Sequence, residues 1–389
     1  MYPKSIATYI IVFFLSIHAM FAQNKTSTIE ADIHSYSLYE NGKWKELLYY
    51  STDYLKNGGE DFLYLRLRMG YAAFMLNNFS EAIKHYNAVL KKDHQNGIAH
   101  YYIKQCRIFL KQDEMADFEN IYLSEKIKPY NITGISTEGS FKSTNTASRE
   151  NAYYQDILLS TRLHRKLHMQ HGLNYYSQAI SETDLTGVTK NNQIQINQPG
   201  YYNRTSFNIN NRWQIIGAYH YTYTPFNNFT YNNHIGMLGV KYFSNYWSLQ
   251  ADAILGNMID TSLQQYDLQL ALYPLGNMNL YFFTTGTMRS RKGENNFNLH
   301  EVAGMKLCNK LWIQGNITIG SFNNYFENDA FYVYNSIDKD IIKTGGTIFY
   351  TIKSKLSIHL GYTFEQKQLY NKEFYYYQHS ITGGLSCKF

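Results

Sequence analysis

The residues of this chain that could do chemistry are its histidines, serines and cysteines, and their spacing does not assemble a catalytic site. A serine nucleophile needs a histidine base on the same face of its element. His379 lies in an alternating segment in which Ser380 points to the opposite face, and His164, His168 and His171 straddle a predicted turn. No GxSxG motif occurs. We therefore predict no catalytic residues and a non-enzymatic protein.

The cysteines and the charge balance exclude further classes of site. Cys106, Cys308 and Cys387 are far apart, without the CxxC or Cys/His spacing of a metal site. The net charge of +6 comes from 36 basic and 30 acidic residues with no long run of one sign. We predict no metal, no cofactor and no nucleic-acid partner.

The first 22 residues have the features of a secretory signal peptide. Lys4 supplies the positive start, an apolar stretch follows from Ala7 to Ile17, and the small Ala22 precedes the expected cleavage point. An uncleaved anchor helix is the weaker alternative because the apolar run is shorter than a bilayer requires. Residues 23–389 are thus expected to be exported.

Residues 23–128 show helical spacing and an internal repeat. The segment Leu63 to Asn96 spans 34 residues, and it resembles a tetratricopeptide repeat. Small residues let the paired helices approach and larger ones fill the space between repeats, which assigns repeat-packing roles to Gly70, Phe79, Ala82, Tyr86 and Leu90. The pattern departs from the repeat at Arg66 and His94. The resemblance implies a surface for a protein partner; a rigid spacer is the alternative.

Residues 129–389 alternate with period two. In Leu356 to Phe364 every second residue is apolar, with polar or small residues between, which is typical of strands with one apolar face. A soluble sandwich would share this pattern. The expected strands hold about 11 to 14 residues, which matches a tilted membrane-crossing strand better than a soluble one. The chain has 38 Tyr but only 17% charged residues, which also suits a membrane barrel.

Turns and loops add the asymmetry of such a barrel. Very short turns alternate with longer polar connections, which we expect at residues 181–200, 290–296, 323–339 and 366–372. Strands are predicted at residues 131–143, 151–164, 166–179, 200–210, 212–224, 231–243, 246–257, 263–273, 278–290, 296–308, 310–322, 340–352, 354–365 and 374–389. This predicts an antiparallel transmembrane barrel of 14 strands, within a range of 12 to 16. A further strand at 328–336 is the main alternative.

The last strand ends the chain on an aromatic residue. Gly384, Cys387 and Phe389 resemble the terminal signal by which bacterial outer-membrane barrels are recognised for insertion. The resemblance implies the barrel-insertion machinery as a partner and outer-membrane lipid as the surroundings.

Alternation also predicts which side chains face the lumen. The polar members of the inward set are Asp156, Arg162, His168, Gln170, Gln250, Asp252, Asp267, Gln269, His359 and Glu365. They could line a path for a hydrophilic solute, or cross-link a closed lumen. Tyrosine pairs at 153–154, 175–176, 201–202 and 375–377 could stack on sugars, but strand-end aromatics more often form the interfacial girdle.

The whole arrangement resembles outer-membrane proteins of Bacteroidota in which a YaiO-like barrel follows tetratricopeptide repeats, and the segment IKPYNITGISTEGSF resembles their junction. The resemblance implies an outer-membrane location, with the repeat domain in the periplasm bound to a protein partner. It favours a pore or export component. A closed-lumen structural or assembly scaffold is the first alternative, and an outer-membrane lipid-modifying enzyme is the second.

Overall fold

The computed structural model describes residues 27–123, 130–183, 189–226, 229–336, 338–353, 355–370 and 374–389. The predicted signal peptide lies outside these residues. The chain divides into two compact units, residues 1–103 and 104–389. The described part of the first unit is helical, and the second unit contains all the described strands.

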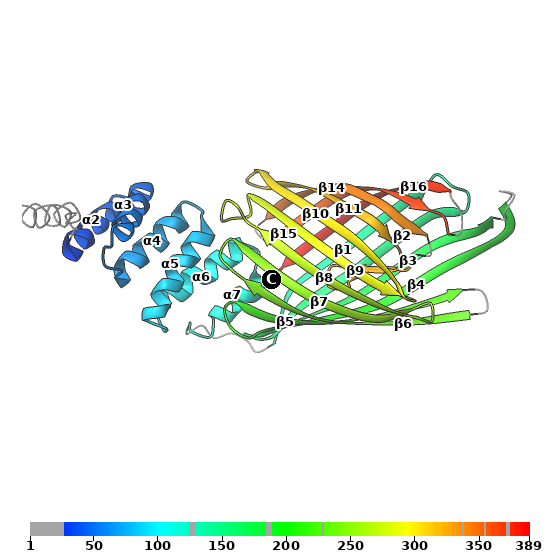
Figure 1. The fold of residues 1–389 in the computed structure, drawn as a ribbon, viewed down its shortest axis with the longest axis horizontal. Helices are drawn as coiled ribbons and strands as arrows, with labels where there is room; N and C mark the ends of the chain where they lie inside the picture. Colours follow the sequence, from blue (N-terminus) through cyan, green and yellow to red (C-terminus); the bar gives the residue numbers. More distant parts are fainter. Residues whose placement is uncertain are drawn as a thin grey trace, which may run out of the picture. The chain divides into compact units, whose positions relative to one another are not determined.

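Six helices precede the strands in the described residues (Figure 1). They are α2 (Thr28–Glu40), α3 (Trp44–Lys56), α4 (Leu63–Met75), α5 (Phe79–Lys92), α6 (Gly97–Phe109) and α7 (Asp113–Glu119). The side chain of Asn78 caps α5 by accepting a hydrogen bond from the Glu81 backbone N–H. Basic side chains occupy the last turn of α5, where they interact favourably with the negative end of the helix dipole. Among the described helices, none is long and apolar enough to cross a membrane.

The predicted repeat, Leu63 to Asn96, coincides with the helix pair α4 and α5. Gly70 lies directly against Tyr86, since a Cβ atom at Gly70 would be 2.8 Å from Tyr86 Cζ. The Tyr86 ring stacks on Tyr102 at 5.4 Å. Phe79, Ala82 and Leu90 are also buried. The helices pack as pairs, while the tetratricopeptide assignment itself stays a prediction.

Arg66 occupies the position where the repeat usually has an aromatic residue. Its Nε and Nη2 atoms donate to the two carboxylate oxygens of Asp61, both at 2.8 Å. Nη1 lies 3.1 Å from Nδ1 of the buried His85, and Nε2 of His85 lies 3.2 Å from Glu81. Burial lowers the pKa of His85, and because Arg66 can only donate, the neutral ring accepts at Nδ1 and donates from Nε2.

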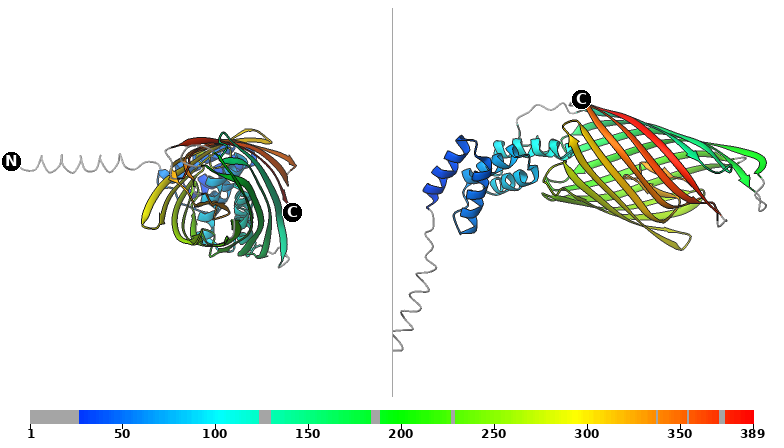
Figure 2. Two further views of the ribbon diagram at one scale, coloured as in Figure 1. Left: turned by 90° about the vertical axis from the view of Figure 1, so that its right-hand side faces the viewer. Right: turned by 90° about the horizontal axis from the view of Figure 1, so that it is seen from above.

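Fourteen described strands close into one antiparallel barrel, which confirms the predicted fold class (Figure 2). Each strand pairs with its neighbours along the chain, except that β11 pairs with β14 and β1 with β16. The strands are β1 (Asn131–Thr144), β2 (Arg149–His164), β3 (Leu167–Thr183), β4 (Thr189–Asn208), β5 (Trp213–Phe226), β6 (Phe229–Phe243), β7 (Trp247–Met258), β8 (Thr261–Leu272), β9 (Leu280–Arg291), β10 (Glu294–Cys308), β11 (Leu311–Phe322), β14 (Lys339–Lys353), β15 (Leu356–Gln368) and β16 (Tyr375–Lys388).

Two predicted loops are largely strand. β3 and β4 continue into the stretch 181–200, pairing as far as Thr183 and Thr189, and the expected loop at 290–296 reduces to a turn at Lys292 and Gly293. Both turn residues have positive φ, 51° and 81°, as a tight hairpin requires. The loops were predicted from the polar composition of these segments. The predictions were wrong because hydrogen bonds between strand backbones do not require apolar side chains.

The predicted loop at 323–339 contains a small hairpin instead. β12 (Tyr325–Glu327) and β13 (Tyr332–Tyr334) pair only with each other. The alternative of a further barrel strand at 328–336 is therefore wrong: these residues turn away from the wall and enter the lumen.

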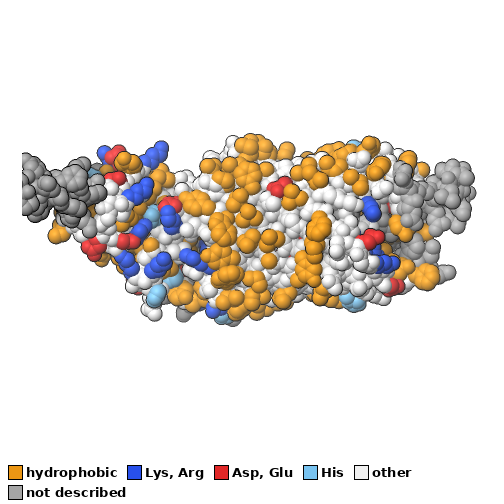
Figure 3. Space-filling view, in the orientation of Figure 1, with side chains coloured by type: hydrophobic (Ala, Val, Ile, Leu, Met, Phe, Trp, Pro, Cys, Tyr) orange, Lys and Arg blue, Asp and Glu red, His pale blue; other side chains and the backbone are white. Residues whose placement is uncertain are grey.

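The outer wall of the barrel is apolar. Large side chains such as Leu238, Leu360 and Ile381 are 57–63% exposed. Their inward-facing neighbours are polar or small except Met237, which packs in an apolar cluster with Phe326 and Ala330. Figure 3 shows hydrophobic side chains spread over the barrel surface with few charged ones between them. An apolar outer face around a polar interior is the arrangement of a barrel in lipid.

Candidate functional site

The lumen is obstructed by the segment between β11 and β14, whose described residues 323–336 and 338 are here called the hairpin. Its root is fixed by Arg149 of β2, whose Nε and Nη2 atoms bind both carboxylate oxygens of Asp338 at 2.7 and 3.0 Å. The hydroxyl of Tyr376 donates to the same carboxylate at 2.8 Å. Both members of the ion pair are buried, so removing either one leaves an uncompensated charge.

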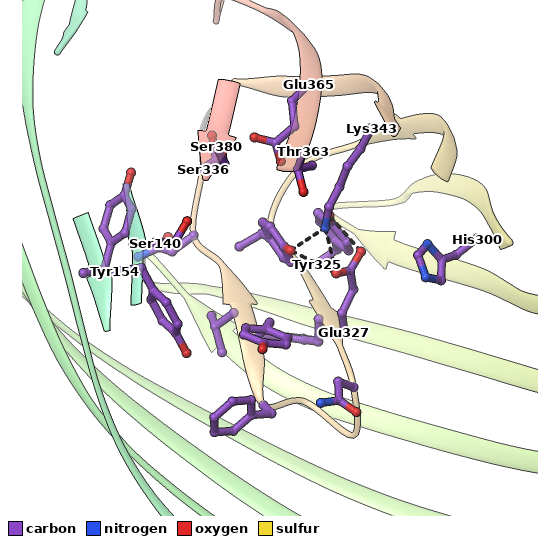
Figure 4. A pocket seen from close by; sticks show the side chains of 18 of the residues that line it. Ser140, Tyr154, His300, Tyr325, Glu327, Ser336, Lys343, Thr363, Glu365 and Ser380 are labelled. Carbon is purple, nitrogen blue, oxygen red and sulfur yellow. Dashed lines mark hydrogen bonds and ion pairs between the residues drawn. The ribbon is translucent and has the colours of Figure 1, made fainter. Parts of the chain in front are cut away.

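The middle of the hairpin is held by two separate strands of the wall, β8 and β14. Gln265 of β8 accepts from the Phe326 N–H at 3.0 Å and donates to the Phe326 carbonyl at 2.8 Å, as a strand neighbour would. From β14, Nζ of Lys343 donates to Glu327 at 2.9 Å and also to the Tyr334 hydroxyl. Figure 4 shows Lys343 pointing at Glu327 beside Tyr325.

The tip of the hairpin reaches deep into the barrel. Asp329 accepts hydrogen bonds from Nε of Arg204 at 2.8 Å and from Nε2 of Gln250 at 2.7 Å. Nδ1 of His220 donates to the Ala330 carbonyl at 2.8 Å. Arg204 lies only four residues from the end of β4, next to the mouth that carries the short turns and both barrel termini.

That mouth is closed by α7, which belongs to the same compact unit as the barrel. The Glu114 carboxylate accepts from Nη1 of Arg204 at 2.9 Å, from the Ser206 hydroxyl at 2.7 Å and from Nε2 of Gln214 at 2.8 Å. The Asn208 side chain donates to the Glu114 carbonyl at 2.6 Å. α7 is thus bound to the inner wall of the barrel.

A second carboxylate of α7 makes a parallel set of contacts. Asp117 pairs with Nη1 of Arg162 at 2.7 Å and with Nε2 of His168 at 3.0 Å. Arg107, in the second half of α6, donates to the Asn211 carbonyl at 2.9 Å. Residues from 104 onward thus belong to the same compact unit as the barrel, while the domain boundary at residue 128 stays a prediction.

Arg204 binds both closures at once. We call Asp329, Arg204 and Glu114 the clasp. Burial alone would raise the pKa of Glu114, but the Arg204 guanidinium, His168 and the Ser206 hydroxyl together lower the pKa to about 2. The Glu114 end of the clasp is therefore charged at neutral pH, with one cation between two anions.

The remaining predicted lumen residues occupy two levels. Gln250, Asp252, Asp267, Gln269, His359 and Glu365 line a cavity of about 790 Å³ that surrounds the hairpin. Asp156 is buried, and Gln170 donates to the Ser160 hydroxyl at 3.4 Å. Asp252 and Asp267 stand directly opposite each other on β7 and β8. Arg162 and His168 contact α7 instead of the cavity.

The tyrosine pairs divide between the two sides of the wall. Tyr153, Tyr175, Tyr201, Tyr375 and Tyr377 are exposed on the outside, whereas Tyr154 and Tyr176 line the cavity, as does Tyr376. Consecutive strand residues alternate in direction. The interpretation that both tyrosines of each pair belong to the interfacial girdle was therefore wrong for the tyrosine that faces the lumen.

The end of the chain closes the barrel. Gly384 stands opposite Glu138 and Cys387 opposite Ile135 in the β1–β16 pairing. The Phe389 N–H donates to the Thr133 carbonyl at 3.0 Å, and its side chain is exposed on the surface. The role of these residues in insertion stays a prediction.

No described group of histidine, cysteine and acidic side chains is arranged to hold a metal ion. On the outer wall Nδ1 of His379 lies 2.7 Å from the Tyr362 hydroxyl, so this histidine has a tyrosine neighbour rather than a serine.

Sequence reasoning missed the clasp. Arg204 is not in the predicted inward set, although its alternation with Ser206 and Asn208 along β4 was a signal that could have placed it there. Glu114 and Asp329, however, carry no periodic signal, because one lies on a seven-residue helix and the other in a loop.

Comparisons with known proteins found no matching family model and no matching curated protein. Among solved structures, a bacterial polysaccharide outer membrane secretin is similar with a TM-score of 0.42 and 8% identity, over 67% of this chain and 99% of that one. The Pseudomonas putida toluene transporter TodX has a TM-score of 0.43 and 9% identity, over 69% and 91%. A Pseudomonas aeruginosa FadL homologue has a TM-score of 0.43 and 9% identity, over 71% and 92%.

Fold and site together define a class. The second unit is a closed, 14-stranded antiparallel β-barrel with an apolar outer wall and a polar lumen, obstructed by an internal hairpin and by a helix at one mouth.

Proposed function

We propose that this protein is an outer-membrane pore for hydrophilic solutes, in a closed conformation. The observation that carries the proposal is the hairpin. It lies inside a largely polar lumen, in which Phe326 and Ala330 also pack on an apolar cluster of the wall. Every hydrogen bond and ion pair quoted above between the hairpin and the wall involves a side chain rather than the main-chain ladder. Such a hairpin can leave the lumen without opening the barrel wall.

The clasp suggests how opening is controlled. The Arg204 guanidinium is held by two carboxylates, Glu114 of α7 and Asp329 of the hairpin. A displacement of α7 would remove Glu114 and leave Arg204 bound to Asp329 alone. An even strand number puts both barrel termini at one mouth, which we assign to the periplasm. A periplasmic protein bound to the helical unit would then act on the hairpin through α7. Outer-membrane lipid and the barrel-insertion machinery complete the proposed partners.

A closed-lumen scaffold is the second candidate. It is favoured by the buried ion pairs Arg149–Asp338 and Lys367–Asp340, which cross-link the interior at 2.7 and 2.6 Å.

Single-channel recording in planar bilayers tests the proposal. We expect the full-length protein to show rare openings and the Arg204→Gln variant to open often, because the clasp is cut. Arg212→Gln, at an exposed arginine of the same mouth, is the matched control and should behave as wild type. Absence of current steps in all three proteins would reject the pore and favour the scaffold. Heat-modifiable migration in gels verifies that each variant is a folded barrel.

A further inference from the structure

The two closures of the barrel are acidic, and the wall side chains that bind them are basic. The described residues of the hairpin contain three acidic side chains and no lysine, arginine or histidine. Each of the three forms an ion pair with the wall, and these pairs are Glu327–Lys343 at 2.9 Å, Asp329–Arg204 at 2.8 Å and Asp338–Arg149 at 2.7 Å. In α7, Glu114 and Asp117 likewise bind Arg204 and Arg162.

The hairpin reverses the net charge of the cavity lining. The described basic side chains of the wall that line the cavity are Lys142, Arg149, Lys241, Lys343 and Lys367. Four acidic side chains of the wall line it as well, and the hairpin adds its three carboxylates. With the hairpin in place, five basic side chains thus face seven acidic ones, a net charge of −2; without it they face four, a net charge of +1.

The acidic side chains of the wall keep partners when the hairpin is withdrawn. These partners belong to the wall itself, in the contacts Gln250–Asp252 and Gln265–Asp267 at 2.9 Å, His359–Glu138 at 3.1 Å, Lys367–Glu365 at 3.8 Å and Lys367–Asp340 at 2.6 Å. Withdrawal of the hairpin therefore does not leave these carboxylates exposed without a partner.

Lys343 and Arg204 differ in this respect, because they bind the closures. The two hydrogen bonds quoted for Lys343 go to Glu327 and Tyr334 of the hairpin, and its Nζ lies 4.4 Å from the centre of the Tyr334 ring. Lys343 lies four residues from the start of β14, and Arg204 lies four residues from the end of β4, at the opposite mouth. Opening thus releases one cation toward each end of the lumen.

A carboxylate of a solute can occupy the places that the hairpin leaves. Lysine and arginine bind carboxylates through charge-assisted hydrogen bonds, and basic side chains along a lumen raise the local concentration of anions. We infer that the open pore conducts solutes that carry carboxylate groups, which replace Glu327 at Lys343 and Asp329 at Arg204. The hairpin is then an internal competitor of the solute. The inference rests on the proposed pore and names the charge class of its solute.

The test uses a full-length open form in which the cations of the wall are intact. In the double variant Glu327→Gln with Asp329→Asn, two hairpin carboxylates become amides of nearly the same size. The hairpin loses its ion pairs with Lys343 and Arg204, while the wall is unchanged. In planar bilayers, a gradient of N-methylglucamine gluconate compares a cation and an anion of similar size. We expect a reversal potential that corresponds to a several-fold higher permeability of gluconate.

The other outcomes separate the inference from the pore. Equal or higher permeability of the cation would overturn the inference while leaving the pore intact. If Arg204→Gln opens and the double variant does not, the two carboxylates do not hold the hairpin, and the inference fails as well. No current steps in either protein would reject the proposed pore itself.

A further substitution in the double variant locates the selectivity. Because Glu327 is already neutral there, Lys343→Gln leaves no carboxylate without its partner, and it should lower the permeability ratio of gluconate to the cation several-fold. Lys353→Gln, at an exposed lysine near the other end of β14, is the matched control and should leave the ratio unchanged. An effect of Lys343→Gln no larger than that of the control would contradict a solute site at Lys343. Heat-modifiable migration verifies that each variant is a folded barrel.

Discussion

At the scale of single residues, the low pKa of Glu114 means that the clasp loses this ion pair only in strongly acidic solution. Its pKa is lowered from 4.5 to about 2, so the stabilisation of the closed mouth is fully present above about pH 4.5. It decreases as the pH falls toward 2, where the carboxylate takes up a proton.

The corresponding variant is Glu114→Gln. We expect its open probability in bilayers to exceed that of wild type at pH 7, and the difference between the two proteins to shrink from pH 4.5 downward. Asp113→Asn, at the exposed neighbour that pairs with Lys388, is the control and should follow wild type at every pH. A constant difference down to pH 2.5 would show that Glu114 does not hold α7.

At Gly70 the local geometry decides whether substitution by alanine stabilises or destabilises the helical unit. Alanine stabilises an ordinary helix interior by about 1 kcal/mol relative to glycine, but here the new Cβ would be 2.8 Å from the Tyr86 ring. The ring is buried and stacked on Tyr102, so it cannot move away easily. We expect Gly70→Ala to destabilise the helical unit by about 1–3 kcal/mol, measured by circular dichroism at the helical wavelength during urea unfolding.

Gly97 is the matched control. It begins α6, and a Cβ there meets no atom within 4 Å, so Gly97→Ala should be neutral or stabilising. Equal effects of the two substitutions would mean that Gly70 is not needed for close packing.

At the scale of elements, the hairpin depends on its root. Asp338→Asn leaves the buried Arg149 without its counter-charge, which costs about 3–5 kcal/mol in such sites. Hydrogen exchange should therefore accelerate at residues 325–334, while strands such as β6 keep their protection. The double variant Arg149→Met with Asp338→Leu removes both charges and should recover much of the protection. Unchanged exchange in the single variant would contradict the assigned root.

Some elements of this fold could be predicted from the sequence and others could not. Leu356 to Phe364 was recognisable as a strand because one of its faces is apolar, and the same logic placed Gln250 and Glu365 inward. β12 and β13 were not recognisable, since strands of three residues are too short to show a period. Their position depends on contacts between residues far apart in the chain, such as Arg204 with Asp329, which no local pattern encodes.

At the scale of the whole molecule, the tyrosine-rich, charge-poor composition follows from a wall with two different sides. Outward positions contact lipid under the proposed location, and inward positions contact the lumen and hairpin. Neighbouring residues near the middle of one strand should therefore respond oppositely to the same new charge.

Ile381 and Thr382 on β16 form such a pair. Ile381 is 57% exposed on the outer wall, and Thr382 lines the cavity. Arginine on the lipid side near the bilayer midplane costs about 2–4 kcal/mol, so Ile381→Arg should lower barrel stability by this amount in lipid vesicles, measured by urea unfolding. Thr382→Arg should cost less, because its guanidinium reaches the polar lumen. If Ile381→Arg were as stable as wild type while Thr382→Arg unfolded, the outer wall would not face lipid, and the proposed membrane location would be wrong.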